Sequence, residues 1–369
     1  MTRLCFVNAR QGNHFMTELL AGVASVAADE GVSVSLVFDA FPPDDPRTVY
    51  VVIPHEFFTV VPPEGWPSLR QLKSTIAFCV EMPGTTWFDL TATYAAHAAA
   101  AVAISRSAVF ELRRRGVPAE HFQLGYCREW DTWRGDPAEP RPIDVLYMAS
   151  ADERRARFLA GFAGGLWRWR SSLLVPPVAP KTGPRPDYLT GAEKYGRMRS
   201  SKVLLNLHRG ESRSLEWVRV LEAICNGCVV LSEHSPDHEP LVPGAHFVSA
   251  SPENLGFLAD HLLEDPDRLA TMRRAAYDFV RTDLPMGPAV ARLLAIADGL
   301  VAQCGSVREA APTGARLPSP SPPIPAATGP VSDGVLDELA QVWIALNRLT
   351  VQNAETRRLV GALLPSGGE

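Results

Sequence analysis

The stretch from Lys202 to Glu233 constrains this chain most, because it places one amphipathic helix between two short apolar segments. Val203–Leu207 is a short, mainly apolar segment bounded by polar residues, and Cys228–Leu231 is an uninterrupted apolar run, as in a strand covered on both faces. Between them, Leu215–Asn226 repeats apolar residues at helical spacing, and the following Gly227 is the residue type that commonly ends a helix. The stretch therefore predicts a β–α–β unit. Its polar loop follows the first strand, where open α/β sheets bind ligands.

The same alternation of strands and helices extends from the N-terminus to residue 304. The chain opens with a predicted strand at Arg3–Asn8, a helix at Gln11–Glu30 and a second strand at Val32–Asp39. Further strands are predicted at Thr48–Ile53, Thr75–Val80, Ala101–Ile104, Phe122–Gly125, Leu173–Val175 and His246–Ser249. A polar segment with three prolines, Asp131–Pro142, interrupts the pattern before it restarts at Ile143–Met148. We therefore expect an α/β protein with two Rossmann-like domains, 1–135 and 143–304, facing a cleft.

The C-terminal region differs from both predicted domains. Residues 305–330 are rich in Pro, Ala, Ser and Thr and predict a linker. Residues 331–364 predict an amphipathic helix, because its apolar residues from Leu336 to Leu349 recur three and four residues apart. Such a helix would serve in a homo-oligomer or in docking a partner. The alternative is that it folds back on its own chain.

Composition excludes several classes of protein. A net charge of −5 over 369 residues does not suggest a general nucleic-acid binder. We find no apolar run near the ~20 residues of a membrane span, and the N-terminus has no sustained apolar signal segment. Six scattered cysteines suggest reduced thiols rather than a disulfide framework. We expect a cytoplasmic protein.

Four segments resemble the two-Rossmann-domain (GT-B fold) glycosyltransferases. They are Val145–Arg155, Leu221–Ser232 and Glu264–Ala276 in the second predicted domain, and Val102–Ala108 in the first. The amino-acid sequence of these segments is most similar to the spore-maturation-type group of bacterial glycosyltransferases, and the resemblance covers residues 3–302. It implies transfer of a sugar from a nucleotide-diphosphate sugar to a glycan, lipid or small-molecule acceptor, without nucleic acid as a partner.

The resemblance also gives Glu222 a role. Retaining members of the family carry two glutamates spaced E-x7-E, and Glu222 matches the second, while Ser214 stands in place of the first. We therefore leave the stereochemistry open. A carboxylate accepts hydrogen bonds from two vicinal hydroxyls, which suits the donor's ribose. The alternative is a surface triad, in which Glu222 pairs at helical spacing with Arg219 and Glu216.

The diphosphate would lie over the polar loop that precedes the helix. Free backbone amides and the helix dipole favour anions there, and arginines add charge. A second basic pair follows the strand at Ile143–Met148, on an expected loop. The candidate diphosphate-binding residues are His208, Arg209, Arg213, Ser214, Arg154 and Arg155. These charges would stabilise the departing diphosphate without a metal, and we expect no cofactor beyond the donor.

For the reacting centre, we look to the strand ends of the first domain. Glu81 follows the buried strand Thr75–Val80 and precedes Pro and Gly in an irregular turn, so it is the first candidate for a general base. His14, in the first loop, is the second catalytic candidate. His97 is a weaker alternative, because a lone histidine on an alanine-rich helix is commonly structural.

Two motifs that suggest metals have ordinary explanations. Cys225 and Cys228 with His234 and His238 could bind zinc, but their spacing is shorter than the usual finger and the cysteines fall on expected core positions. Asp265-Pro-Asp267 has a D-x-D form, yet Asp-Pro is common in the turn between two helices. We expect no metal site.

Three alternatives remain from the sequence. A sugar-nucleotide epimerase has the same architecture and needs no acceptor. A non-catalytic GT-B-like assembly protein would keep the fold and use its C-terminal helix. Peripheral contact with anionic lipid through Arg113–Arg115 is a further option, although exposed arginines at a helix end are commonplace.

Overall fold

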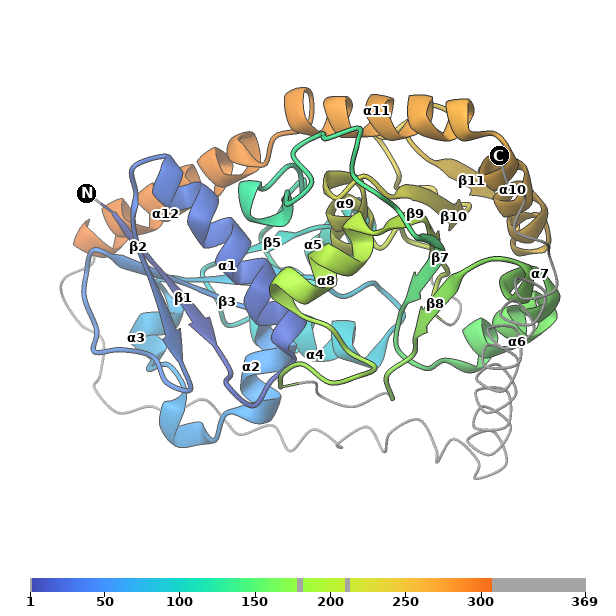
Figure 1. Cartoon of the computed structure of the whole chain (residues 1–369). Helices are drawn as coiled ribbons and strands as arrows, with labels where there is room; N and C mark the ends of the chain where they lie inside the picture. The colour runs from blue at the N-terminus through green and yellow to red at the C-terminus, as the bar shows by residue number, and fades with distance from the viewer. Residues whose placement is uncertain (1, 178–181, 210–212, 307–369) are drawn as a thin grey trace, which may run out of the picture.

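The computed structural model describes residues 2–177, 182–209 and 213–306. It contains two parallel sheets, each flanked by helices, in two lobes joined side by side (Figure 1). The strand order is β2-β1-β3-β4-β5-β6 in the first sheet and β11-β10-β9-β7-β8 in the second. The predicted α/β class and two-domain architecture are therefore confirmed. Residues 331–364 and all but the first two residues of the predicted linker lie outside the described residues.

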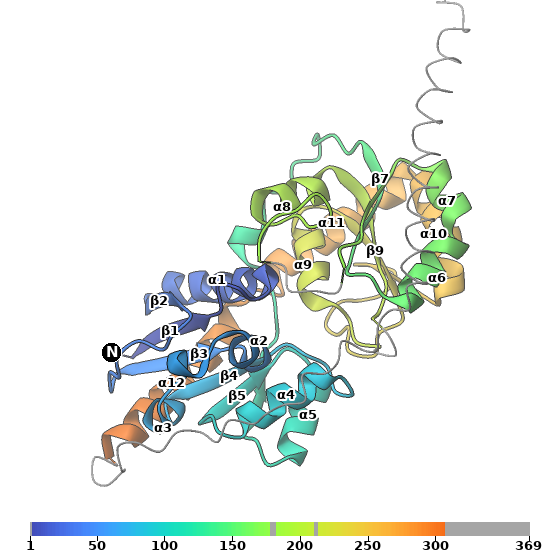
Figure 2. The ribbon, with the colours of Figure 1, turned by 90° about the horizontal axis from the view of Figure 1, so that it is seen from below.

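The first domain is a six-stranded parallel sheet with helices on both faces (Figure 2). Its strands are β1 (Arg3–Asn8), β2 (Ser33–Phe38), β3 (Thr48–Val52), β4 (Thr75–Cys79), β5 (Ala100–Ala103) and β6 (Ala119–His121). Its helices are α1 (His14–Asp29), α2 (Pro54–Val60), α3 (Leu69–Leu72), α4 (Thr86–Ala95) and α5 (Arg106–Arg114). Every residue of β3 and β4 is buried, which explains their uninterrupted apolar sequences.

One prediction in this domain is wrong in detail. The strand expected at Phe122–Gly125 lies earlier, as β6 (Ala119–His121). The residues that follow β6 lead toward the second domain, and Tyr126 forms an isolated β-bridge with Pro285. The segment after β3 is a helix, α2, whose first residue is Pro54. Proline suits the first helical position, because the amide hydrogen that it lacks has no partner within the helix there.

The second domain has five parallel strands. They are β7 (Ile143–Met148), β8 (Ser171–Leu174), β9 (Ser201–Asn206), β10 (Val229–Glu233) and β11 (Val248–Ala250). The helices are α6 (Glu153–Gly161), α7 (Ala163–Arg168), α8 (Gly191–Arg199), α9 (Trp217–Cys225), α10 (Pro252–Glu264) and α11 (Pro266–Thr282). The predicted β–α–β unit is confirmed as β9–α9–β10, and Gly227 ends its helix with a positive φ of 71°.

The arginines after β7 need a correction. They were expected on a loop, but Arg154 and Arg155 belong to the first turn of α6. Asp152 is the N-cap, and its Oδ1 accepts a hydrogen bond of 3.1 Å from the amide of Arg155. This cap satisfies one of the free amides at the helix start, which is why the helix begins so soon after the strand.

The last helix, α12 (Gly287–Ser306), returns to the first domain. It packs against α1 and β3, and Figure 1 shows it along the lobe that contains the N-terminus. An ion pair of 2.5 Å joins Arg292 to Glu120 of the first domain. The boundary predicted at 143–304 therefore needs a correction: the second domain's sheet and helices end before α12, which completes the first domain.

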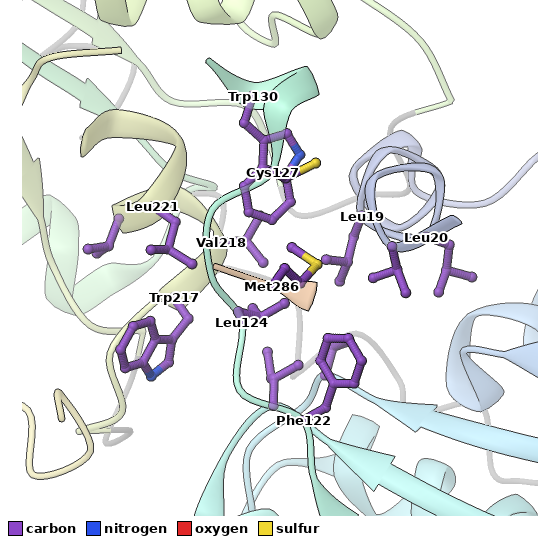
Figure 3. Packing of buried hydrophobic residues seen from close by; sticks show 14 of the residues in the cluster. Leu19, Leu20, Phe122, Leu124, Cys127, Trp130, Trp217, Val218, Leu221 and Met286 are labelled. Carbon is purple, nitrogen blue, oxygen red and sulfur yellow. The ribbon is translucent and has the colours of Figure 1, made fainter. Parts of the chain in front are cut away.

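One hydrophobic cluster joins the two domains. Figure 3 shows Leu19 and Leu20 of α1 near Trp130 and Met286, with Val218 of α9 on the other side. All of these side chains are buried. Because the cluster draws on both domains, their junction is a packed core rather than a free linker.

Candidate active site

Loops after the strands of both sheets meet between the domains. A small cavity of about 40 Å³ is lined by Ser105, His121 and neighbouring residues of the first domain and by Trp217, Asp237 and neighbouring residues of the second. These residues lie at or just beyond the carboxyl ends of β5, β6 and β10 or near the start of α9. The two parallel sheets thus bring the carboxyl ends of their strands together, which is the edge where open α/β sheets bind ligands.

Arg154 takes part in a charged cluster at the edge of the second sheet. Its Nη1 lies 2.7 Å from Glu233 Oε1, and its Nη2 contacts Glu233 Oε2. The amide of His208 donates to Glu233 Oε1 at 2.8 Å, and His208 Nε2 lies 2.8 Å from Ser235 Oγ. Burial alone would raise the pKa of Glu233, but Arg154 and His208 outweigh it and lower that pKa. Glu233 is therefore an anion that holds this edge together.

Arg155 is enclosed, with only 3% of its side chain exposed. Its Nε donates to the carbonyl of Leu207 at 3.0 Å, and its Nη2 contacts Glu216 Oε1. Glu216 also pairs with Arg219 at 2.7 Å. Burial would raise the pKa of Glu216, but Arg219 and Arg155 lower it overall. Arg155 thus fixes the connection between β9 and α9, and this arrangement leaves its guanidinium turned to protein groups rather than to a diphosphate.

The loop between β9 and α9 carries the exposed positive charge. Arg209 and Arg213 are both exposed, and neither forms an ion pair with a described residue. Ser214 is half-buried at the end of the same loop. Arg213 lines a cavity of about 540 Å³ together with His234, Ser235, Pro236, His238, Pro243 and Ser249. A cavity of this size is within the usual range for small-molecule sites.

Glu222 lies deeper than expected. Only 3% of it is exposed, and its Oε1 accepts a hydrogen bond of 2.6 Å from Lys194 Nζ. The same Nζ donates to Glu18 Oε2 of the first domain at 2.8 Å. Burial would lower the pKa of Lys194, but Glu222 and Glu18 outweigh it and raise that pKa. Glu222 is therefore no part of a surface triad; it belongs to a buried network between the domains.

His14 reaches the same network from the first domain. Its Nε2 lies 3.7 Å from Glu18 Oε1, one turn along α1. The two predictions His14 and Glu222, made for opposite halves of the site, are thus linked through Glu18 and Lys194. Both hydrogen bonds from described residues to Glu222, from Lys194 and from Tyr195 at 3.5 Å, end on Oε1. No described residue donates a hydrogen bond to its Oε2.

Glu81 faces the charged loop of the second domain. Burial raises its pKa to about 7, while the positive charge of Arg209 lowers that pKa and Glu216 raises it. About 21% of the Glu81 side chain is exposed. Its Oε1 lies 3.4 Å from Nε2 of the buried His55, in α2. Glu81 therefore lies within electrostatic range of Arg209, whereas His97 lies beyond the end of α4.

Several of these residues escaped the sequence analysis. Glu233 ends a buried strand and His55 follows one, so a search of strand ends would have found both. Lys194 and Glu18 gave no such signal, because each lies inside an ordinary amphipathic helix. Their contact joins positions 176 residues apart.

The motifs that suggested metals have structural roles here. Cys228 Sγ donates to the carbonyl of Met198 at 3.0 Å, and Cys225 lies in the buried face of α9. Asp265 caps α11 by accepting from the amide of Arg268 at 2.9 Å. Within residues 2–177, 182–209 and 213–306, no group of three or more His, Cys, Asp and Glu side chains could hold a metal ion.

The arginines considered for lipid contact are engaged within the protein. Arg114 pairs with Glu111 at 2.7 Å, Arg115 pairs with Asp89 at 2.8 Å, and Arg113 Nε donates to the carbonyl of Ala119 at 2.7 Å. Among the described helices, none combines the length and apolar character needed to cross a bilayer.

Comparison with known proteins agrees with this geometry. Residues 150–294 match a family model described as glycosyl transferase-like. The structure of WaaG, a glycosyltransferase involved in lipopolysaccharide biosynthesis, aligns with a TM-score of 0.51 and 12% identity over 80% of this chain and 100% of its own. Anabaena Alr3699/HepE in complex with UDP-glucose aligns with a TM-score of 0.52 and 9% identity over 80% and 100%. No curated protein sequence matches significantly.

A third structure extends the comparison. AviGT4, a glycosyltransferase involved in avilamycin A biosynthesis, aligns with a TM-score of 0.50 and 14% identity over 82% of this chain and 99% of its own. At these identities the likeness concerns the fold. The chain thus has the GT-B fold, and residues 150–294 are similar to a glycosyl transferase-like family. The narrower resemblance to the spore-maturation group stays a prediction.

Proposed function

We propose that this protein transfers a sugar from a nucleotide-diphosphate sugar to an acceptor hydroxyl. The observation that carries the proposal is the buried carboxyl group of Glu81, within electrostatic range of Arg209 in the other domain. One side of the interface supplies a carboxyl group whose pKa of about 7 suits a general base. The other supplies the positive charge of Arg209, which has no ion pair with a described residue, at the edge of a domain similar to a glycosyl transferase-like family.

The donor would bind to the second domain. Its diphosphate would contact the exposed Arg209 and Arg213, with Ser214 and the amides before α9 beside them. The Arg154–Glu233–His208 cluster holds this edge in place and offers Arg154, which is 38% exposed, as a further contact. Glu222 is the proposed ribose partner, and its Oε2 is the oxygen that would accept from the hydroxyls. HepE, of the same fold, has been crystallised with UDP-glucose, which supports a donor of this class.

In the proposed reaction, Glu81 removes the proton of the acceptor hydroxyl. The acceptor oxygen forms a bond to the anomeric carbon, and the bond from that carbon to the diphosphate breaks. Arg209 and Arg213 stabilise the negative charge that develops on the departing diphosphate. His14 is the second candidate base, since it lies at the start of α1 beside Glu18.

Finer features belong to the same proposal. We propose that the transferred sugar is a hexose and that the arginines replace a metal, so that transfer persists in a chelator. The five free, buried cysteines with described side chains support a reducing, cytoplasmic setting. Oligomer formation or partner docking through residues 331–364 is proposed from the sequence pattern alone, and deletion of 305–369 tests it by the change in oligomeric state.

Product analysis tests the proposed reaction most simply. The full chain is incubated with UDP-glucose, UDP-N-acetylglucosamine, GDP-mannose and dTDP-glucose, each with and without a mixture of monosaccharide and lipid acceptors. We expect release of the nucleoside diphosphate from one donor, faster with acceptor and lost in Glu81→Gln. An isomerised donor without release would instead indicate an epimerase. Absence of any nucleotide binding would favour a non-catalytic protein.

A further inference from the structure

His55 occupies a position that the proposed reaction does not yet use. It lies in the first turn of α2 and is only 3% exposed. Its Nε2 is 3.4 Å from Glu81 Oε1, and its Nδ1 is 3.1 Å from Thr91 Oγ1 of α4. The imidazole therefore lies between a fully buried hydroxyl and the carboxyl group of Glu81, which is within electrostatic range of Arg209.

We propose that His55 is a positioning residue, which binds one oxygen of Glu81 as a neutral hydrogen-bond donor and leaves the other to the acceptor hydroxyl. This inference rests on the proposed function in so far as Glu81 is the base. The contact itself does not depend on that reaction, so it can be tested without substrate.

The three groups form a consistent hydrogen-bonded series. In the proposed series the Thr91 hydroxyl is the donor in its 3.1 Å contact with Nδ1, which would fix the neutral tautomer with hydrogen on Nε2. Nε2 lies 3.4 Å from Glu81 Oε1, and in the proposed series its hydrogen is directed to that oxygen. When Glu81 takes the acceptor's proton on Oε2, Oε1 becomes a carbonyl oxygen that still accepts from Nε2–H. One proton moves from acceptor to Glu81, and the imidazole changes neither its tautomer nor its charge.

The surroundings keep His55 neutral. Burial lowers the pKa of His55 to about 4, although the nearby Glu56 opposes this shift. The Trp87 ring, 6.0 Å from the imidazole centroid, is its aromatic neighbour. Charged groups that face Glu81 are Arg209 and Glu216, both from the second domain. A charged imidazolium would lower the pKa of Glu81 and weaken Glu81 as a base. A neutral imidazole instead orients the Glu81 carboxylate at little cost to its basicity.

A histidine-selective NMR titration of the full chain tests the series directly. With ¹⁵N-labelled histidine, we expect His55 to remain a neutral Nε2–H tautomer from pH 5 to 8. Its Nε2 shift should show a step near pH 7, where Glu81 ionises. In Glu81→Gln, the step should disappear. A charged ring at pH 7, no step, or a step that persists in Glu81→Gln would each overturn the proposal.

A second variant separates positioning from folding. Thr91→Val keeps the shape of a fully buried side chain but removes the donor to Nδ1, so we expect a mixture of tautomers. The matched control is Thr93→Val, exposed on the same helix, which should leave the spectrum unchanged. A single Nε2–H tautomer in Thr91→Val would contradict the proposed role of Thr91 in the series.

Turnover of UDP-glucose provides the kinetic readout. We expect Thr91→Val to lower kcat about tenfold with KM little changed, because the base is misoriented while donor binding is intact. An unchanged kcat, together with loss of activity in Glu81→Gln, would overturn the positioning role alone. Full activity in Glu81→Gln would instead overturn the proposed base, while the NMR titration would still decide whether His55 contacts Glu81.

Discussion

Glu81 shows how one carboxyl group links stability to function. Its folded pKa of about 7 lies above its ordinary value of 4.5, so the folded state retains a proton that the unfolded state loses. Ionisation of Glu81 therefore opposes folding as pH rises from 4.5 to 7. A base held in this way is maintained at the expense of stability, which is common at active sites.

The first prediction follows from that linkage. Between pH 4.5 and 7, we expect the free energy of unfolding of Glu81→Gln to rise relative to wild type by up to ~1.4 kcal/mol per pH unit. Urea unfolding at several pH values measures the difference between the two proteins. Parallel stability curves across this range would mean that Glu81 titrates normally and that its proposed role as a base near neutrality is wrong.

Arg209 supports the second prediction. Because its side chain is exposed and has no ion pair with a described residue, it is free to bind a diphosphate. Removing a charged hydrogen-bond donor typically costs ~1.5–3 kcal/mol, so Arg209→Ala should weaken nucleoside-diphosphate binding at least about tenfold. Arg157→Ala, an exposed arginine elsewhere in the second domain, is the control. Equal affinities of both variants for the nucleoside diphosphate would show that Arg209 does not contribute to binding.

At the scale of elements, Gly227 carries the junction between α9 and β10. Its φ is +71°, and a Cβ added there would lie 2.1 Å from Arg141 Nη2 and 2.8 Å from the Trp133 ring. Arg141 in turn donates to the carbonyls of Ser201 and Asn226 at 2.9 and 3.0 Å. The glycine is therefore required twice, for its backbone conformation and for its lack of a side chain.

The third prediction compares two glycines that end helices. Gly116 has a similar φ of +81°, but nothing lies within 4 Å of a Cβ added to it. Gly116→Ala should thus cost only the left-handed conformation, about 1–2 kcal/mol, whereas Gly227→Ala should cost clearly more. Chemical denaturation of both variants gives the comparison. If the two losses are the same, the contacts with Arg141 and Trp133 carry no energetic weight.

The elements also show what the sequence can reveal. The unit β9–α9–β10 and its terminal glycine were predictable, because burial on both faces and helix ends leave local patterns. The sequence did not indicate the start of α6, because Arg154 and Arg155 follow a strand in a polar segment typical of a loop. In the structure, Asp152 caps the helix and both arginines lie in its first turn. Glu81 and Arg209 could be proposed from strand ends, but only tertiary structure revealed that they approach each other.

For the whole molecule, the junction between domains combines apolar and charged contacts. The cluster around Trp130 and Met286 draws on both domains, and the Glu18–Lys194–Glu222 network crosses the same junction. The Thr132 hydroxyl donates to Asn226 Oδ1 at 2.7 Å, and Asn226 Nδ2 donates to the carbonyl of Trp130 at 2.7 Å. Such contacts between distant positions leave no local pattern, which is why the sequence suggested a cleft but not this core.

The fourth prediction concerns the lysine at that junction. Lys194→Met would leave the buried Glu222 and the half-buried Glu18 without their cation, and breaking a buried ion pair typically costs ~3–5 kcal/mol. Lys202→Met, which removes a lysine paired with Asp144 but 29% exposed, should cost at most ~1 kcal/mol. Thermal and urea unfolding report both. Comparable stability of the two variants would show that the network contributes little to holding the domains together.

Nucleotide binding tests the central claim that the second domain holds a sugar-nucleotide donor. Isothermal titration calorimetry of the full chain with UDP, GDP, ADP, CDP and dTDP should reveal binding of at least one. That affinity should fall at least about tenfold in Glu222→Gln and in Arg209→Ala, with folding verified by melting temperature. Binding of none of the five nucleotides by the wild-type protein, or unchanged affinity in both folded variants, would contradict the proposed donor site.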